Sequence, residues 1–135
     1  MLGIGRVGNI AFNEPGSRLN STTRLILLDN ASRNEASKIF GTLDNTPISS
    51  ITMGVATILG AKKVYLLAWG ENKAAMIKEC VEGPITDTIP ASYLQTHNHE
   101  KVLIWELDES IIEIVGSGFS KSELIELSKF VKKVE

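Results

Sequence analysis

Short apolar runs alternate with polar, helix-like segments along this chain. The runs cover residues 24–29, 64–69 and 102–107, and their apolar residues are consecutive rather than alternating. Such runs are typical of strands that are buried on both faces, as in a parallel sheet covered by helices. We therefore predict strands of a largely parallel sheet over these ranges, with residues 1–4 as the end of a further strand.

The segments between the runs favour helices, at roughly residues 32–40, 50–59 and 72–81. Strands that alternate with helices indicate the α/β class. We predict a Rossmann-like, largely parallel sheet flanked by helices. A length of 135 residues suits a single domain.

The last segment departs from this alternation. Gly116 and Gly118 suggest a flexible linker, and Ser120 with Glu123 fits a capping box at a helix start. Apolar residues then recur at helical spacing, which predicts a C-terminal helix that packs on the sheet edge or on a partner subunit. We divide the chain into residues 1–115, the α/β part, and residues 116–135, the linker and helix.

Composition narrows the class of partners. A net charge of −2 argues against binding to nucleic acid or to an anionic membrane, because both require a basic face. The sequence has no apolar run of the roughly 18 residues that a membrane span needs, and its start lacks the pattern of a signal peptide. The single Cys80 is consistent with a reducing compartment, and we expect it to be structural. These features predict a cytoplasmic location.

The turn at Gly70 is a candidate binding feature. A predicted buried strand ends at Trp69, Gly70 allows a tight turn, and a helix then begins. Ligands of open α/β sheets bind at the carboxyl ends of the strands, where helix N-termini offer free amides. Lys73 in a first helical turn is mildly unfavourable unless an anion lies in front of it. From the pattern alone, a solvated surface lysine is the alternative.

The opening loop, residues 3–15, is the other candidate. Gly3, Gly5 and Gly8 allow positive φ angles and close approach to a ligand, and Glu14 stands just before the rigid Pro15. A constrained loop rarely stands at a free terminus, because termini fray. We therefore expect that the remainder of such a site lies outside these residues.

Residues 3–15 resemble the signature loop of the glucosamine-6-phosphate deaminase/isomerase family, whose usual form is Gly-x-Gly-x-Asp-Gly-His-Ile-Ala-Phe-Asn-Glu-Pro. The resemblance continues through Ser21-Thr22-Thr23-Arg24, residues 51–59 and Gly70-Glu71-Asn72-Lys73-Ala74. It covers roughly residues 3–107, which correspond to the C-terminal half of a family member.

The resemblance implies conversion of an aminosugar phosphate to a ketose phosphate and ammonia, without a cofactor. In the family, a loop His opens the sugar ring, and an Asp and a Glu orient it. Here Asn9 stands in place of the His and Val7 in place of the Asp, while Glu14 keeps the catalytic carboxylate. Asn9 cannot exchange a proton near neutral pH. We expect either altered or absent deamination, or a sugar-phosphate-binding sensor module of the same superfamily.

The resemblance also suggests a set of substrate-binding residues. Family members bind the sugar phosphate through a lysine at the position of Lys73. Residues 36–40 align with a helix end where the family usually has an arginine, and we expect Lys38 there to bind substrate. Gly5 and Gly8 line the loop, and Arg6 adds a cation. The family's general base and first phosphate loop lie in its N-terminal half, so we expect that half as a partner, and a homo-oligomer formed through the exposed sheet edge.

A His-x-His pair, His97 and His99, is a possible zinc-binding motif. No third Cys, His or carboxylate follows at a matching spacing, so we predict no metal site. His97 is expected to serve the structure near the start of a strand.

Overall fold

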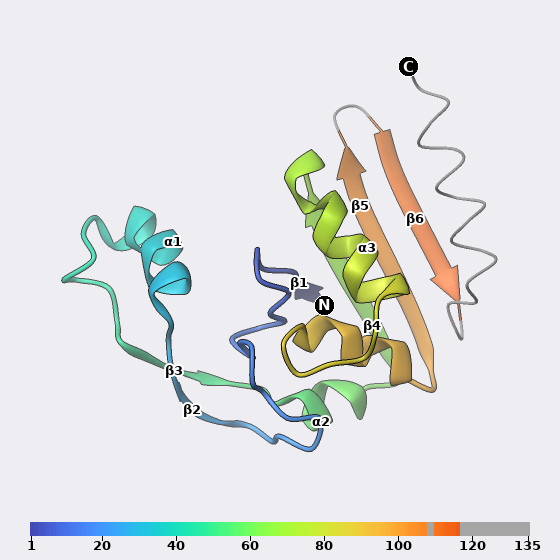
Figure 1. Cartoon of the computed structure of the whole chain (residues 1–135), viewed down its shortest axis with the longest axis horizontal. Helices are drawn as coiled ribbons and strands as arrows, with labels where there is room; N and C mark the ends of the chain where they lie inside the picture. Colours follow the sequence, from blue (N-terminus) through green and yellow to red (C-terminus); the bar gives the residue numbers. More distant parts are fainter. Residues whose placement is uncertain (108–109, 117–135) are drawn as a thin grey trace.

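The computed structural model describes residues 1–107 and 110–116, and the predicted C-terminal helix lies outside this part of the chain. A four-stranded sheet has the order β1-β4-β5-β6 (Figure 1). It consists of β1 (Leu2–Gly3), β4 (Lys63–Trp69), β5 (Glu100–Leu107) and β6 (Ser110–Gly116). The pairs β1–β4 and β4–β5 are parallel, which confirms the predicted α/β class with a largely parallel sheet.

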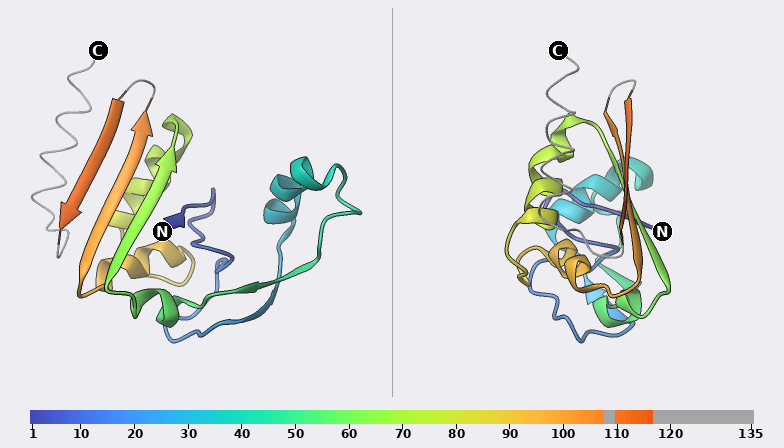
Figure 2. Two further views of the ribbon diagram at one scale, coloured as in Figure 1. Left: turned by 180° about the vertical axis from the view of Figure 1, so that it is seen from behind. Right: turned by 90° about the vertical axis from the view of Figure 1, so that its right-hand side faces the viewer.

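Helices pack on this sheet and close its core. They are α2 (Val55–Leu59), α3 (Ala74–Glu82) and the 3-10 helices η1 (Glu71–Lys73) and η2 (Pro90–Thr96). The edge-on view in Figure 2 shows α3 and η2 on the same side of the sheet. The core combines side chains of both layers, among them Ile10, Ile58, Leu66, Ile77 and Leu103. We call the sheet with these helices and residues 4–15 the body.

An arm extends from the body (Figures 1 and 2). It consists of the antiparallel ribbon of β2 (Arg24–Leu27) and β3 (Ser49–Thr52), with α1 (Asn30–Phe40) at its far end. The prediction that residues 24–29 form a strand of the main sheet, buried on both faces, is therefore wrong. Leu25 and Leu27 are 69% and 76% exposed, because β2 pairs only with β3 and nothing in the described chain covers that face.

The predicted helix over residues 50–59 is also only half correct. Its first part belongs to β3, and α2 begins at Val55. β-Branched Ile51 and Thr52 favour a strand, and Gly54 separates the two elements. A Cβ at Gly54 would lie 2.2 Å from the backbone oxygen of Ser21, so only glycine fits where the two segments meet.

Strand β6 was not predicted. It pairs antiparallel with β5, and Gly116, assigned to the linker from sequence, is its last residue, opposite Lys101. Strands that are adjacent in the chain pair antiparallel through short connections, whereas the sequence pattern predicted a largely parallel sheet with a linker from residue 116. Within residues 1–107 and 110–116, no helix has the length and apolar character that crossing a membrane requires.

Candidate functional site

The opening loop folds back tightly at the carboxyl end of β1. The Gly5 amide donates to the Asn9 carbonyl over 2.9 Å, and the Gly8 amide donates to the Gly5 carbonyl over 3.2 Å. A Cβ on Gly5 would lie 1.7 Å from Asn9 Oδ1, and a Cβ on Gly8, whose φ is +77°, would lie 2.6 Å from the Ile89 side chain. Gly8 is therefore required for loop packing, whereas a side chain at Gly5 would displace the side chain of Asn9.

Asn13 anchors this loop from the inside. Its side chain is fully buried, and its Nδ2 donates to the carbonyls of Ile10 (3.0 Å) and Met53 (2.7 Å). Its Oδ1 accepts from Arg24 Nη1 at 2.8 Å. Buried amides are kept only where such partners satisfy them. The contact between Asn13 and Arg24 joins the body to the arm; the sequence contained both residues within the matched motifs but gave no signal that they touch.

A cleft of about 270 Å³ separates the opening loop from α1. This volume is near the lower end of small-molecule pockets, roughly 300 Å³. The cleft contains four positions that the sequence analysis singled out, and α1 adds polar groups that it missed. The lining residues are Arg6, Val7 and Asn9 from the loop, and Ala31, Ser32, Asn34, Glu35 and Lys38 from α1.

The cleft combines charged and neutral hydrogen-bonding groups. The loop contributes one cationic residue, Arg6, and α1 contributes a second, Lys38, together with the acidic Glu35. Cations of this kind bind phosphate by charge-assisted hydrogen bonds, and the amide and hydroxyl groups of the lining suit sugar hydroxyls. No imidazole is among the lining residues.

Glu14, the predicted catalytic carboxylate, is not part of the cleft lining. Its Oε2 accepts from the Asp29 amide at 3.0 Å, at the start of α1. Its Oε1 is buried and has no hydrogen-bond partner among the described residues. Glu14 instead borders an open hollow of about 490 Å³ between the opening loop and β2.

Lys73 is likewise outside the cleft lining. It is half-buried at the start of α3, and its Nζ donates to the Ile4 carbonyl at 2.9 Å. An ammonium carries three donors, so this contact occupies one of them. The lysine thus holds the end of β1 where the opening loop begins.

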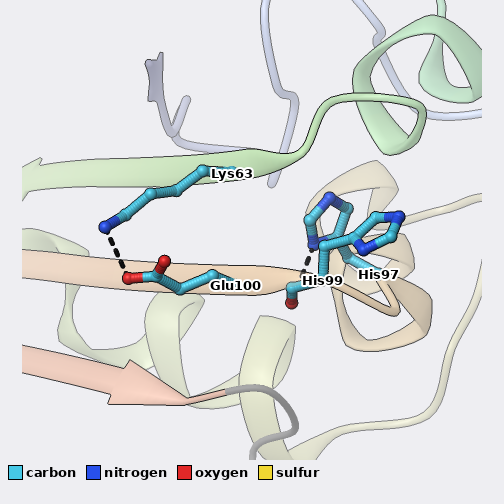
Figure 3. Close-up of polar contacts among 4 residues, drawn as sticks. All are labelled: Lys63, His97, His99 and Glu100. Carbon is cyan, nitrogen blue, oxygen red and sulfur yellow. Dashed lines mark hydrogen bonds and ion pairs between the residues drawn. The ribbon is translucent and has the colours of Figure 1, made fainter.

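His97 and His99 lie at the starts of β4 and β5 (Figure 3). His97 is buried, and its Nε2 and Nδ1 face the carbonyls of Ala61 (2.7 Å) and His99 (3.2 Å). The neighbouring Lys63 and Glu100, which are cross-strand partners, form an ion pair. In the described ranges, no three His, Cys, Asp or Glu side chains are arranged to hold a metal ion. The contacts of His97 fit the structural role predicted for it.

Two further buried groups are structural. Burial raises the pKa of the Cys80 thiol to about 12, so this side chain stays a neutral thiol rather than a nucleophile. Lys101, which sequence reasoning overlooked, donates to the carbonyls of Leu94 and Gln95 at the end of η2. Burial lowers the pKa of Lys101.

Similar solved structures indicate the class of protein to which this chain belongs. The chain has the fold of a monomeric glucosamine-6-phosphate deaminase of the NagB superfamily, with a TM-score of 0.72 and 39% identity, over 80% of this chain and 44% of that one. A 6-phosphogluconolactonase from Trypanosoma cruzi shares the fold at a TM-score of 0.55 and 18% identity, over 78% of this chain and 36% of that one. The protein is thus a Rossmann-like α/β protein of this superfamily.

Sequence comparison places the chain more closely, although no family model matches it. A glucosamine-6-phosphate deaminase-like protein of Bacteroides thetaiotaomicron is 91% identical over 104 residues, which are 77% of this chain and 16% of that protein. Glucosamine-6-phosphate deaminases of Cellvibrio japonicus and Streptococcus equi subsp. zooepidemicus are 51% and 42% identical, over 78% and 84% of this chain and 40% and 48% of theirs.

These relationships confirm the resemblance found in the opening loop: over these residues the chain belongs to the glucosamine-6-phosphate deaminase family. The chain spans about half the length of the Streptococcus relative (48%) and of the solved deaminase (44%).

Proposed function

We propose that this chain forms part of a site that binds the phosphate ester of an amino sugar or hexose in the cleft between the opening loop and α1. The observation that carries this proposal is the convergence of Arg6 and Lys38 on one cleft from two elements far apart in the sequence. A sugar phosphate presents a dianion, hydroxyls and, in an amino sugar, an ammonium group. Arg6 and Lys38 match the dianion, and Glu35 matches the ammonium.

Lys73 supports the same site through its contact at the start of the opening loop. Its contact with the Ile4 carbonyl fixes the start of the loop, so in this proposal Lys73 acts on the site through the position of the loop. Gly5 and Gly8 contribute by keeping the loop tight enough to present Arg6 to the cleft.

Binding is proposed in preference to efficient deamination. Ring opening needs a group that exchanges protons near neutral pH, and the cleft lining offers only Arg6, Lys38 and Glu35 as titratable groups. Asn9 instead donates to the Ala11 carbonyl over 3.2 Å. The second candidate is slow deamination of sugar that opens spontaneously; it is favoured by the names of the relatives, which are deaminases.

The part of the relatives that this chain does not span is the proposed partner. Among the described strands, β1 is at the edge of the sheet and pairs on one side only, with β4. An open hollow of about 490 Å³ lies beside it, lined by Gly3, Ile4 and Gly5 and by apolar residues that include Phe12, Ile51 and Met53. An unpaired strand edge next to apolar side chains favours addition of further strands. Self-association through the same edge is proposed for the chain without that partner, because one strand edge can pair with only one further strand. A cytoplasmic location is also proposed.

Calorimetric titration tests the binding. Glucosamine 6-phosphate is titrated into this chain alone, and then into a mixture of this chain with the flanking part of the Bacteroides relative. We expect measurable heat, and a loss of affinity of about tenfold in Arg6→Ala and in Lys38→Ala, because each removes a charge-assisted hydrogen bond. Lys78→Ala, an exposed lysine on α3, is the matched control and should bind unchanged.

Absence of heat with both amino-sugar and hexose phosphates would contradict the proposal. So would an affinity in Arg6→Ala and in Lys38→Ala that equals the affinity of the unaltered chain. A coupled ammonia assay on the same mixture distinguishes the two candidates. Ammonia release at rates typical of an enzyme would favour the deaminase.

A further inference from the structure

The position of α1 relative to the opening loop depends on few contacts. The helix contributes one wall of the cleft, yet none of its residues is buried. It stands at the end of the arm, away from the sheet (Figures 1 and 2). Packing therefore does not fix its distance from the loop, and a specific polar contact has to do so.

Glu14 provides such a contact. It belongs to the opening loop, and its Oε2 accepts from the amide of Asp29 at 3.0 Å. Asp29 is the N-cap of α1, and its Oδ1 accepts from the Ser32 amide at 2.6 Å. Ser32 in turn lines the cleft. A continuous chain of hydrogen bonds thus runs from the loop through Glu14 and Asp29 into the first turn of the helix.

The helix transmits this contact to Lys38. An α-helix is rigid over a span such as the 11 residues of α1, so a shift of its N-cap moves every later residue. Lys38 lies in the last turn and faces the cleft opposite Arg6. The contact at Asp29 therefore sets the separation of the two cations.

We propose that Glu14 is a positioning residue, which ties α1 to the opening loop through the Asp29 amide and so sets the width of the cleft. This inference rests on the proposed function of the cleft as a sugar-phosphate site. It differs from the role that the sequence resemblance implied for Glu14, which was to orient a catalytic His, because here the carboxylate accepts from the backbone amide of Asp29. The buried, unpartnered Oε1 shows that only one oxygen of the carboxylate is in use among the described residues.

A pair of variants separates the two roles. Glu14→Gln keeps an acceptor oxygen but cannot exchange a proton near neutral pH, whereas Glu14→Ala removes the acceptor. Glu82→Ala, an exposed carboxylate at the end of α3, is the matched control. Amide hydrogen exchange of Asp29, measured by NMR on the full chain, reports the contact directly and needs no ligand.

We expect exchange at Asp29 to be about tenfold faster in Glu14→Ala and nearly unchanged in Glu14→Gln and Glu82→Ala. Affinity for glucosamine 6-phosphate should follow the same order. Equal exchange at Asp29 in all four proteins would overturn the proposal. So would turnover that Glu14→Gln abolishes without changing exchange, because Glu14 would then act on the substrate.

The failure of this inference can be told apart from the failure of the proposed function. If the exchange pattern holds but no sugar phosphate binds, the contact exists and the binding proposal is wrong. If sugar phosphate binds equally well in Glu14→Ala, the cleft binds without this contact and the positioning role is wrong.

Discussion

The body and the arm of this protein differ in how far their apolar side chains are buried. In the body, apolar side chains are enclosed between the sheet and its helices; Leu103 is 1% exposed. In the arm, residues of the same type face solvent: Leu25 and its cross-strand partner Ile51 are 69% and 73% exposed, and Ile39 of α1 is 85% exposed. The body therefore has its own core, whereas the arm has an apolar face whose burial requires a further layer.

The candidate site combines both regions. Arg6 and Asn9 belong to the body, and Ser32 and Lys38 belong to the arm. The definition of the cleft thus depends on contacts between the two regions, which include those of Asn13 with Arg24, of Glu14 with Asp29 and of the Phe12 amide with Thr52 Oγ1. The following variants test whether the body and the arm differ in stability and how they are coupled.

The largest effect is expected from truncating the core of the body. Leu103→Ala should lower the free energy of unfolding by about 2–5 kcal/mol, because it removes buried methyl groups and leaves a cavity. Ile39→Ala, the matched change in the arm, should alter it by less than about 0.5 kcal/mol. Urea denaturation of both variants measures the difference. Equal losses would show that α1 is packed as firmly as the sheet.

A smaller loss is expected from cutting the link between the regions. Asn13→Ala leaves the carbonyls of Ile10 and Met53 and the Arg24 guanidinium without their partner. An unsatisfied buried group costs about 1–3 kcal/mol, so unfolding should become easier by about this amount. Asn20→Ala, an exposed asparagine, is the control. Unchanged stability in Asn13→Ala would mean that water replaces these bonds and that body and arm are not coupled there.

An effect that is small at neutral pH and grows only in the alkaline range is expected at Cys80 in the body. Its thiol ionises near its ordinary value of 9.0 in the unfolded chain but only near pH 12 when folded, because burial raises the pKa. The folded form is thus favoured by the neutral thiol below pH 9.0, and this contribution is lost as pH rises toward 12.

Relative to Cys80→Ala, the wild-type chain should lose about 2 kcal/mol of stability between about pH 8 and about pH 10.5. Comparing the two proteins at each pH removes the contribution of Lys101, whose lowered pKa acts in the opposite direction. Parallel pH profiles would show that the thiol is accessible to water.

The sequence predicted elements well wherever a local pattern sufficed. The runs at residues 64–69 and 102–107 became β4 and β5, and the helices at α1 and α3 lie within a few residues of their predicted bounds. It failed at residues 24–29, because the pattern of a doubly buried strand and that of a strand with one exposed apolar face are the same without knowledge of the neighbour. It failed at residues 50–59, where β3 and α2 share one apolar stretch.

The candidate site likewise has residues that the sequence singled out and residues whose position only the fold revealed. The sequence singled out Asn9 and Lys38 by the resemblance and Arg6 by its charge, and the fold brings all three to one cleft. It could not tell that Glu14 and Lys73 lie outside the lining, because a motif gives spacing along the chain and not the direction of a side chain. Contacts such as those of Asn13 with Arg24 and Met53 join segments 11 and 40 residues apart.

By itself, the sequence determined the family, the α/β class and the substitution of Val7 and Asn9 at two decisive positions, because these depend on residue identity and local periodicity. Only the tertiary structure decided which apolar runs are buried, that the cleft has one wall in the body and one in the arm, and that Glu14 holds the start of α1. Burial and side-chain direction depend on which elements pack together, and that depends on contacts between distant parts of the chain.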